Sequence, residues 1–299
     1  MNESPAKLRT WGESYVFDSW DELLTRLHDA PNQAYKRESS RRTDDRKWSG
    51  TPTYEAAEKL ARGGWLSPIS QIERLCGHVE TKVDASILTT GFQQTWGVAG
   101  SEVDMSLYLD GDPECMIESA PIRISRHGRA VRVVIPCVYS SGCPESEILG
   151  RGAAVVALSD TLAKAQHPLE IWAAYSYSDK TLDGMNGPVI FQTLVRVQRA
   201  NEPIDLGRLG FALAHPSSLR RIGFRCVEAL VTTSRVADGI GYGYGYGTGQ
   251  VDVSQLDEAE NTITVPNLGR SRYLGGTCRW EDEDFQVQWV QDQLARIFD

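Results

Sequence analysis

The chain has 299 residues, of which 41% are hydrophobic and 24% charged, with a net charge of −9 and a pI near 5.2. This composition excludes a fibrous or largely disordered protein, and the acidic balance disfavours broad binding to nucleic-acid phosphates. No apolar run reaches the roughly 20 residues of a membrane span, and the N-terminus lacks the apolar core of a secretory signal. We therefore expect a cytoplasmic protein with no membrane contact.

Two amphipathic helices are predicted near the start of the chain. Residues 10–30 begin with aromatics and end in a helix, which Ser19 can cap and which carries an apolar stripe at helical spacing. A second helix begins after Thr53 and ends at Gly63–Gly64. Because a further helix is expected within 68–90, residues 1–120 are interpreted as a mainly helical N-terminal region.

A basic loop at 35–50 separates these two helices. It contains the cations Lys36, Arg37, Arg41, Arg42, Arg46 and Lys47. One interpretation is a solvated linker, and the other is a contact for phosphate, nucleic acid or an acidic partner. Arg41, Arg42 and Arg46 are therefore candidate partner-binding residues, and nucleic acid is a possible partner of the 36–47 segment.

Residues 96–116 are rich in glycine and acids, which raises the question of a calcium site. The carboxylates of Asp104, Asp110, Asp112 and Glu114 do not match the spacing of a calcium-binding EF-hand loop. We therefore predict no metal, and a turn at 110–113, where Gly111 and Pro113 suit restricted backbone geometry.

Residues 121–299 alternate between strand and helix patterns. Two strand-like runs are joined at 127–128, and the second, from Val131 to Val138, is β-branched enough for a central strand buried on both faces. A long amphipathic helix follows from about 145, and two further strands are joined by the loop 178–187. We expect a three-layer α/β domain, with a sheet flanked by helices.

The remaining elements continue this alternation. The run 206–214 is a predicted helix, His215-Pro216 breaks it, and Ser217 caps another helix that extends to about 230. Residues 230–236 have the pattern of a strand. The chain closes with a helix at 281–298, which has acids in its first turn and Arg296 in its last.

The run VRVVIPCVYSSG, then RGAAVVALSDTLAKAQHPLEIWAAYS and VIFQTLVRVQ, resembles the opening of a von Willebrand factor A-type domain. That family has a hydrophobic central strand, a serine-rich turn, a long helix and two hairpin-linked strands. Its D-x-S-x-S metal motif is absent, because only Ser140 and Ser141 match and Val138 occupies the position of the acid. The resemblance therefore implies the scaffold without its metal.

The order of several pieces also resembles a group of uncharacterised phage and mobile-element proteins. These pieces are a W-G start, a helix ending in G-W, the turn LDGDPECM, an RGAA helix and the segment HPSSLRR. This resemblance covers nearly the whole chain and implies a phage or mobile-element protein, located in the host cytoplasm, with no assigned activity.

Candidate site residues follow the central strand, where open α/β sheets favour ligands. Ser140 and Ser141 are candidate ligand contacts, and Cys143 could act as a nucleophile, although YSSGC does not match a serine-hydrolase motif. The second constellation combines His215, Arg220 and Arg221 at the start of a helix, where they could bind an anion. Alternatively, these are an ordinary turn, a packed histidine and surface arginines.

The stretch GIGYGYGYGTGQ at 239–250 has glycine at every second position. It matches neither phosphate-binding glycine motif, since it has no lysine and its glycines are two apart. If extended, Tyr242, Tyr244 and Tyr246 share one face and are candidate partner contacts. The other interpretation is an irregular loop.

Two functions are compatible with these patterns. The first is a non-catalytic binding or assembly protein of a phage or mobile element, with a protein partner and no cofactor. The alternative is an enzyme that processes a nucleotide or nucleic acid, in which Cys143, His215 and Arg220 meet at one end of the sheet.

Overall fold

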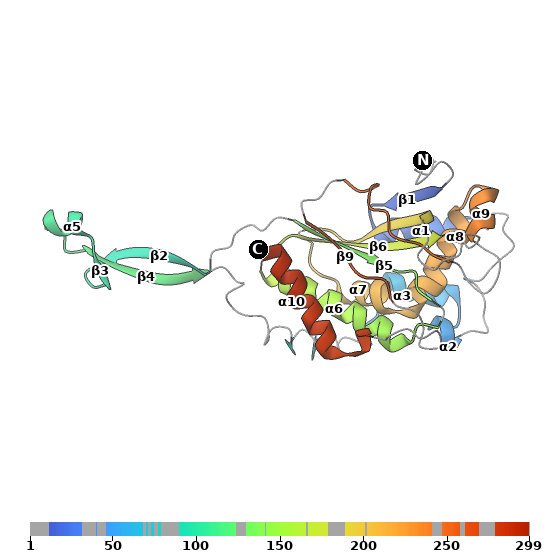
Figure 1. The fold of residues 1–299 in the computed structure, drawn as a ribbon, viewed down its shortest axis with the longest axis horizontal. Helices are drawn as coiled ribbons and strands as arrows, with labels where there is room; N and C mark the ends of the chain where they lie inside the picture. The colour runs from blue at the N-terminus through green and yellow to red at the C-terminus, as the bar shows by residue number, and fades with distance from the viewer. Residues whose placement is uncertain are drawn as a thin grey trace.

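Figure 1 shows an α/β main body and, apart from it, a small antiparallel sheet. The computed structural model describes residues 12–31, 40, 46–67, 70, 73–74, 77–78, 90–123, 130–140, 142–165, 167–178, 189–200, 202–240, 247–257, 261–268 and 279–298. No helix within these ranges is both long and apolar enough to cross a membrane.

The main sheet contains six strands among the described residues. They are β1 (Glu13–Phe17), β5 (Val131–Pro136), β6 (Leu169–Ser178), β7 (Val189–Gln198), β8 (Gly247–Thr248) and β9 (Asn261–Thr264). The order is β1-β7-β6-β5-β9, and β8 pairs with β6. β5 is parallel to β6 and β9, whereas β7 is antiparallel to β6. The expected strand after residue 131 is thus paired on both sides, with β6 at the middle of the order.

Some helices of the main body begin at a residue whose side chain caps them. They are α1 (Trp20–Asp29), α2 (Arg46–Ser49), α3 (Tyr54–Gly63), α6 (Glu145–Lys164), α7 (Leu206–Ala214), the π-helical η3 (Ser218–Gly223), α8 (Phe224–Leu230), α9 (Ser234–Ile240), the short η5 (Arg279–Glu281) and α10 (Glu283–Phe298). Ser19 and Thr53 accept hydrogen bonds from the first turns of α1 and α3, as predicted. Gly64 ends α3 with a positive φ of 83°.

The two faces of the main sheet are covered differently. Buried side chains of all the longer helices join one apolar cluster with Val133, Ile171 and Phe191 from the strands. On the other face, Val134, Trp172 and Leu194 form a smaller cluster covered by the non-helical segment 251–256. In the described part of the chain, this segment takes the place of the second helical layer that the sequence analysis expected.

The small sheet, which we call the arm, comprises residues 90–123. Its strands are β2 (Thr90–Gly97), β3 (Glu102–Val103) and β4 (Met116–Arg123), in the order β2-β4-β3, and the short helix α5 (Met105–Leu109) lies between β3 and β4. The turn expected at 110–113 follows α5, with Gly111 at a φ of 75°. The two strand-like runs around 127–128 therefore belong to different sheets.

Two segments differ from their predicted structure. Residues 13–17, expected only as an aromatic lead into a helix, form β1, which pairs in parallel with β7. Residues 230–236, expected as a strand, end α8 and begin α9. The reason is tertiary: the Glu13 carboxylate accepts hydrogen bonds from the Thr232 and Thr233 amides and so fixes the turn before α9.

The N-terminal region is not purely helical, because it contributes β1 to the main sheet and β2 and β3 to the arm. Side chains from α1 and α3 share the large apolar cluster with those of the later strands. The division into domains at residue 120 stays a prediction.

Candidate functional site

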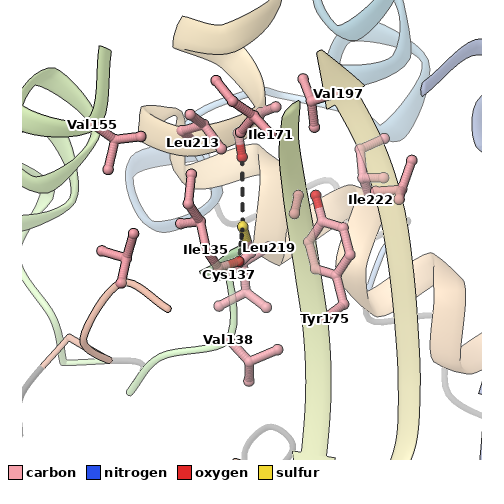
Figure 2. Close-up of a cluster of buried hydrophobic side chains, with 14 of the residues drawn as sticks. Ile135, Cys137, Val138, Val155, Ile171, Tyr175, Val197, Leu213, Leu219 and Ile222 are labelled. Atoms are coloured by element: carbon pink, nitrogen blue, oxygen red, sulfur yellow. Dashed lines mark hydrogen bonds between the residues drawn. The ribbon is translucent and has the colours of Figure 1, made fainter. Parts of the chain in front are cut away.

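The chain leaves the carboxyl end of β5 through a buried turn that leads into α6. Cys137 donates its amide to the Ala174 carbonyl at 2.8 Å, and Figure 2 shows its side chain among Ile135, Val138 and Leu219. Burial raises the pKa of Cys137 to about 11, so the thiol is neutral at physiological pH. Cys137 therefore acts as a small apolar side chain in this core.

Further along this turn, Ser140 and Cys143 are joined through the backbone. The Cys143 amide donates to the Ser140 carbonyl at 3.0 Å, and the Ser140 hydroxyl accepts from the Gly142 amide at 3.4 Å. The Cys143 thiol is buried and donates to the Pro144 carbonyl at 3.8 Å. Ser141 lies outside the described residues.

Two arginines from different helices approach this turn. Arg151, from α6, is 1% exposed, and Arg220, from η3, is 4% exposed. The Arg220 guanidinium donates to the carbonyls of Trp48 and Cys143, and its Cζ lies 4.7 Å and 5.7 Å from the ring centroids of Trp48 and Tyr139. The turn after β5 thus borders a buried, positively charged region.

His215 and Arg221, which sequence reasoning grouped with Arg220, have partners within the protein. His215 stacks on Phe211 and meets Trp65 edge-on, and its Nδ1 accepts the Ser217 amide at 3.0 Å. Burial lowers the pKa of His215 to about 4. Arg221 donates to the Ser40 carbonyl at 2.7 Å and to other oxygens of the segment that precedes α3.

The proposed catalytic partners are not joined directly. No hydrogen bond links His215 to Cys143, and the described residues give His215 no carboxylate partner. Within the same ranges, no group of three or more His, Cys, Asp or Glu side chains could hold a metal ion. A Cys143–His215 pair therefore has no geometric support in this structure.

The predicted partner contacts fall largely beyond what the structure describes. Arg41, Arg42 and the tyrosines Tyr242, Tyr244 and Tyr246 lie outside the described residues, and Arg46 begins α2 with its side chain undescribed. The end of the glycine-rich stretch is described. Gly249 donates its amide to the Ser176 carbonyl at 2.9 Å, and an added Cβ would lie 2.9 Å from the Tyr177 backbone.

The arm carries an apolar surface that sequence reasoning missed. Six of the seven exposed large apolar side chains in the described residues lie on it: Trp96, Val98, Val103, Met105, Tyr108 and Leu109. No side chain described over 95–118 is buried. We call these six residues the arm patch. The sequence did contain one signal of this surface: large apolar residues stand among acids, in a pattern that has neither a helical nor a strand repeat.

Acidic residues are interspersed with the arm patch in the sequence, and one of them, Asp104, partly organises it. The Asp104 carboxylate accepts hydrogen bonds from the Trp96 indole at 3.1 Å and from the Ser106 amide at 3.0 Å. These bonds, the Trp96 bond foremost, lower the pKa of Asp104. Residues 90–123 contain six acids and one base: Glu102, Asp104, Asp110, Asp112, Glu114, Glu118 and Arg123.

A family model described as a domain of unknown function, DUF7192, matches residues 10–287. This range includes the arm and the main body up to the first turn of α10. No curated protein and no solved structure matches the chain.

Proposed function

The chain belongs to the DUF7192 family, whose function is unknown, and we propose that it is a non-catalytic binding or assembly protein that acts through protein–protein contacts. The arm patch carries this proposal. Soluble proteins rarely leave a contiguous apolar surface exposed unless it contacts a partner. Here six large apolar side chains are exposed within residues 96–109.

The energetics of the arm support a role in binding. A hairpin without a buried face is marginal in water, and no side chain described over 95–118 is buried. Covering Leu109 or Tyr108 would each contribute about 2 kcal/mol, and Trp and Tyr are favoured anchors at interfaces. A partner would therefore supply the apolar contacts that the arm lacks.

The charges of the arm indicate the chemistry of this partner. Five more acids than bases over 90–123 repel phosphate groups and favour a protein surface ringed by lysine and arginine. We propose that the partner presents an apolar groove with a basic rim. Tyr242, Tyr244, Tyr246 and the 36–47 segment stay predicted secondary contacts.

The biological setting is proposed from sequence resemblance. The run β5, α6, β6 and β7 follows the order of strand, long helix and hairpin that the von Willebrand A resemblance implies. We propose that the main body is such a scaffold without its metal, in a phage or mobile-element protein of the host cytoplasm. The enzyme alternative gains no support, because His215 and Cys143 share no hydrogen bond.

A site-specific photocrosslinking experiment tests the arm patch. A photoreactive residue at position 109 of the full chain should capture one partner in the native host, and Leu109→Ser with Tyr108→Ser should weaken that partner's affinity at least tenfold. The matched control is Leu66→Ser, which changes another exposed leucine, on the main body, and should leave the affinity unchanged. Rising salt should weaken the complex because the arm is acidic.

Three results would contradict the proposal. Equal affinity of the wild type and the double arm variant would remove the arm patch from the interface. Capture of a second copy of this chain would show that the arm patch mediates self-association, not binding to a partner with a basic rim. Binding that does not depend on salt would contradict the charge argument.

A further inference from the structure

Arg151 is an unusually placed charge. It lies two turns into α6 with 1% exposure, and its Nη1 makes one long hydrogen bond, 3.5 Å, to the Pro266 carbonyl. Its Nε and Nη2 are buried and have no hydrogen-bond partner. Burying a guanidinium is costly unless its charge and its N–H groups are both compensated.

The surrounding side chains supply only part of that compensation. The groups that act electrostatically on Arg151 are Cys137, Tyr139, Cys143 and Glu147. Cys137 and Tyr139 are neutral at physiological pH because burial raises the pKa of both. Glu147 lies one turn earlier on α6 and its charge acts on Arg151, but neither Nε nor Nη2 of Arg151 hydrogen-bonds to it.

Tyr139 presents a second unsatisfied donor in the same region. Its side chain is 6% exposed and its hydroxyl has no hydrogen-bond partner. The Arg220 guanidinium lies over its ring at 5.7 Å, and both Arg220 and Arg151 lower the pKa of Tyr139 against the effect of burial. The hydroxyl is therefore within electrostatic range of both guanidinium groups.

We propose that Arg151 and Tyr139, assisted by the charge of Arg220, bind the phosphate group of a small ligand at the carboxyl end of β5. Nε and Nη2 form one edge of the guanidinium, the edge that grips two phosphate oxygens in a fork. A third phosphate oxygen accepts the Tyr139 hydroxyl. A tetrahedral oxyanion thus serves three donors at once, whereas a planar carboxylate has only the two oxygens that the fork engages.

The place of this site in the fold agrees with its chemistry. Tyr139 follows β5, which is parallel to both of its neighbours, and ligands of open α/β sheets bind beyond the carboxyl ends of such strands. Ser140 and Gly142, which follow Tyr139 in the chain, are half-buried. This site is independent of the arm patch, so either can fail without the other.

Isothermal titration of the full chain with inorganic phosphate tests the site. Binding should be measurable at millimolar phosphate or below, and Tyr139→Phe should weaken it about tenfold through loss of one charge-assisted hydrogen bond. Arg151→Met should abolish it. Tyr15→Phe is the matched control, because Tyr15 lies on β1 and its hydroxyl donates to the Leu230 carbonyl at 2.7 Å. This variant should bind phosphate as the wild type does.

Further titrations distinguish the possible ligands, and a melting experiment controls for misfolding of the variant. Acetate at equal ionic strength should bind at least tenfold more weakly than phosphate, and adenosine triphosphate distinguishes a nucleotide from free phosphate by its tighter binding. Tyr139→Phe removes only an unpartnered hydroxyl, so it should melt at or above the wild-type temperature without phosphate. No heat of binding to any phosphate compound, equal affinity in Tyr139→Phe and wild type, or equal affinity for acetate would each overturn the proposal.

Discussion

The main sheet and the arm are both made of hydrogen-bonded strands, but their side chains have opposite environments. Strands β6 and β7 are buried on both faces along nearly their whole length. The arm has no buried side chain over 95–118, although it contains Trp96, Tyr108 and Leu109. The difference indicates that the main body is stabilised by its own core, whereas the arm keeps apolar groups available for another molecule.

The largest difference between the two regions should appear when a glycine is replaced by alanine. An added Cβ at Gly150 of α6 would lie 1.8 Å from the Trp280 carbonyl oxygen, whereas at Gly97 of the arm it would meet only Ala99, at 3.7 Å. We expect Gly150→Ala to lower the free energy of unfolding by more than about 3 kcal/mol, because α6 must move away from η5. Gly97→Ala should leave the main unfolding transition unchanged. Equal denaturant midpoints for the two variants would contradict the contrast in packing.

The protonation of a buried histidine should produce the next largest effect. The pKa of His215 is about 4 in the folded protein and about 6.5 in an unfolded chain. Between these values the unfolded state binds more protons, so stability falls as pH drops from about 6.5 to about 4, by about 3 kcal/mol in total. The arm contains no histidine, so it contributes no histidine-linked change in stability over this pH range.

Chemical denaturation from pH 4 to pH 7 measures this contribution of His215 to the free energy of unfolding. His215→Gln should be less stable at pH 7, because it loses the stacking on Phe211, yet its stability should vary less with pH. Stability curves of wild type and variant that run parallel across this window would show that His215 does not titrate as argued.

Elements with long repeats could be predicted from the sequence, and short elements that depend on distant partners could not. The helix α6 extends over 20 residues as its long apolar run predicted, although most of its side chains from Glu147 to Ser159 are buried rather than only one stripe of them. Ser19 and Thr53 mark helix starts locally. By contrast, β1 has five residues whose pairing depends on β7. Residues 230–236 resemble a strand because β-branched side chains are frequent there. Instead they form a turn between two helices, which the distant Glu13 stabilises by accepting a hydrogen bond from the Thr233 amide.

The candidate sites divide in the same way. The position after a buried strand made the turn at Ser140 and Cys143 a candidate, and the HPSSLRR segment made Arg220 one; both stay predictions. Arg151 was missed because its neighbours in sequence only suggest a buried helix, and its approach to Tyr139 is set by the packing of α6 on the sheet. The arm patch was missed because residues 96–109 have no repeat from which a common face could be inferred.

The smallest effects should come from two carboxylates that accept similar hydrogen bonds in the two regions. Glu13 is 3% exposed and accepts from the Thr232 and Thr233 amides at 2.9 and 2.8 Å. Glu13→Ala removes both charge-assisted hydrogen bonds and should cost about 2 kcal/mol of unfolding free energy. Asp104→Ala should leave the main transition unchanged and alter only the arm.

The arm itself should respond to acid through Asp104. Its pKa lies below the usual 3.8 because the Trp96 indole and two backbone amides donate to the ionised carboxylate. A lowered pKa means that this contribution is present above the unfolded value and is lost as pH falls through the folded one. The Trp96 indole N–H signal in a nitrogen–proton correlation spectrum should therefore shift toward its Asp104→Ala position only below about pH 4. If that signal is the same in wild type and Asp104→Ala at pH 7, the hydrogen bond does not organise the arm patch, and the patch must be arranged by its partner.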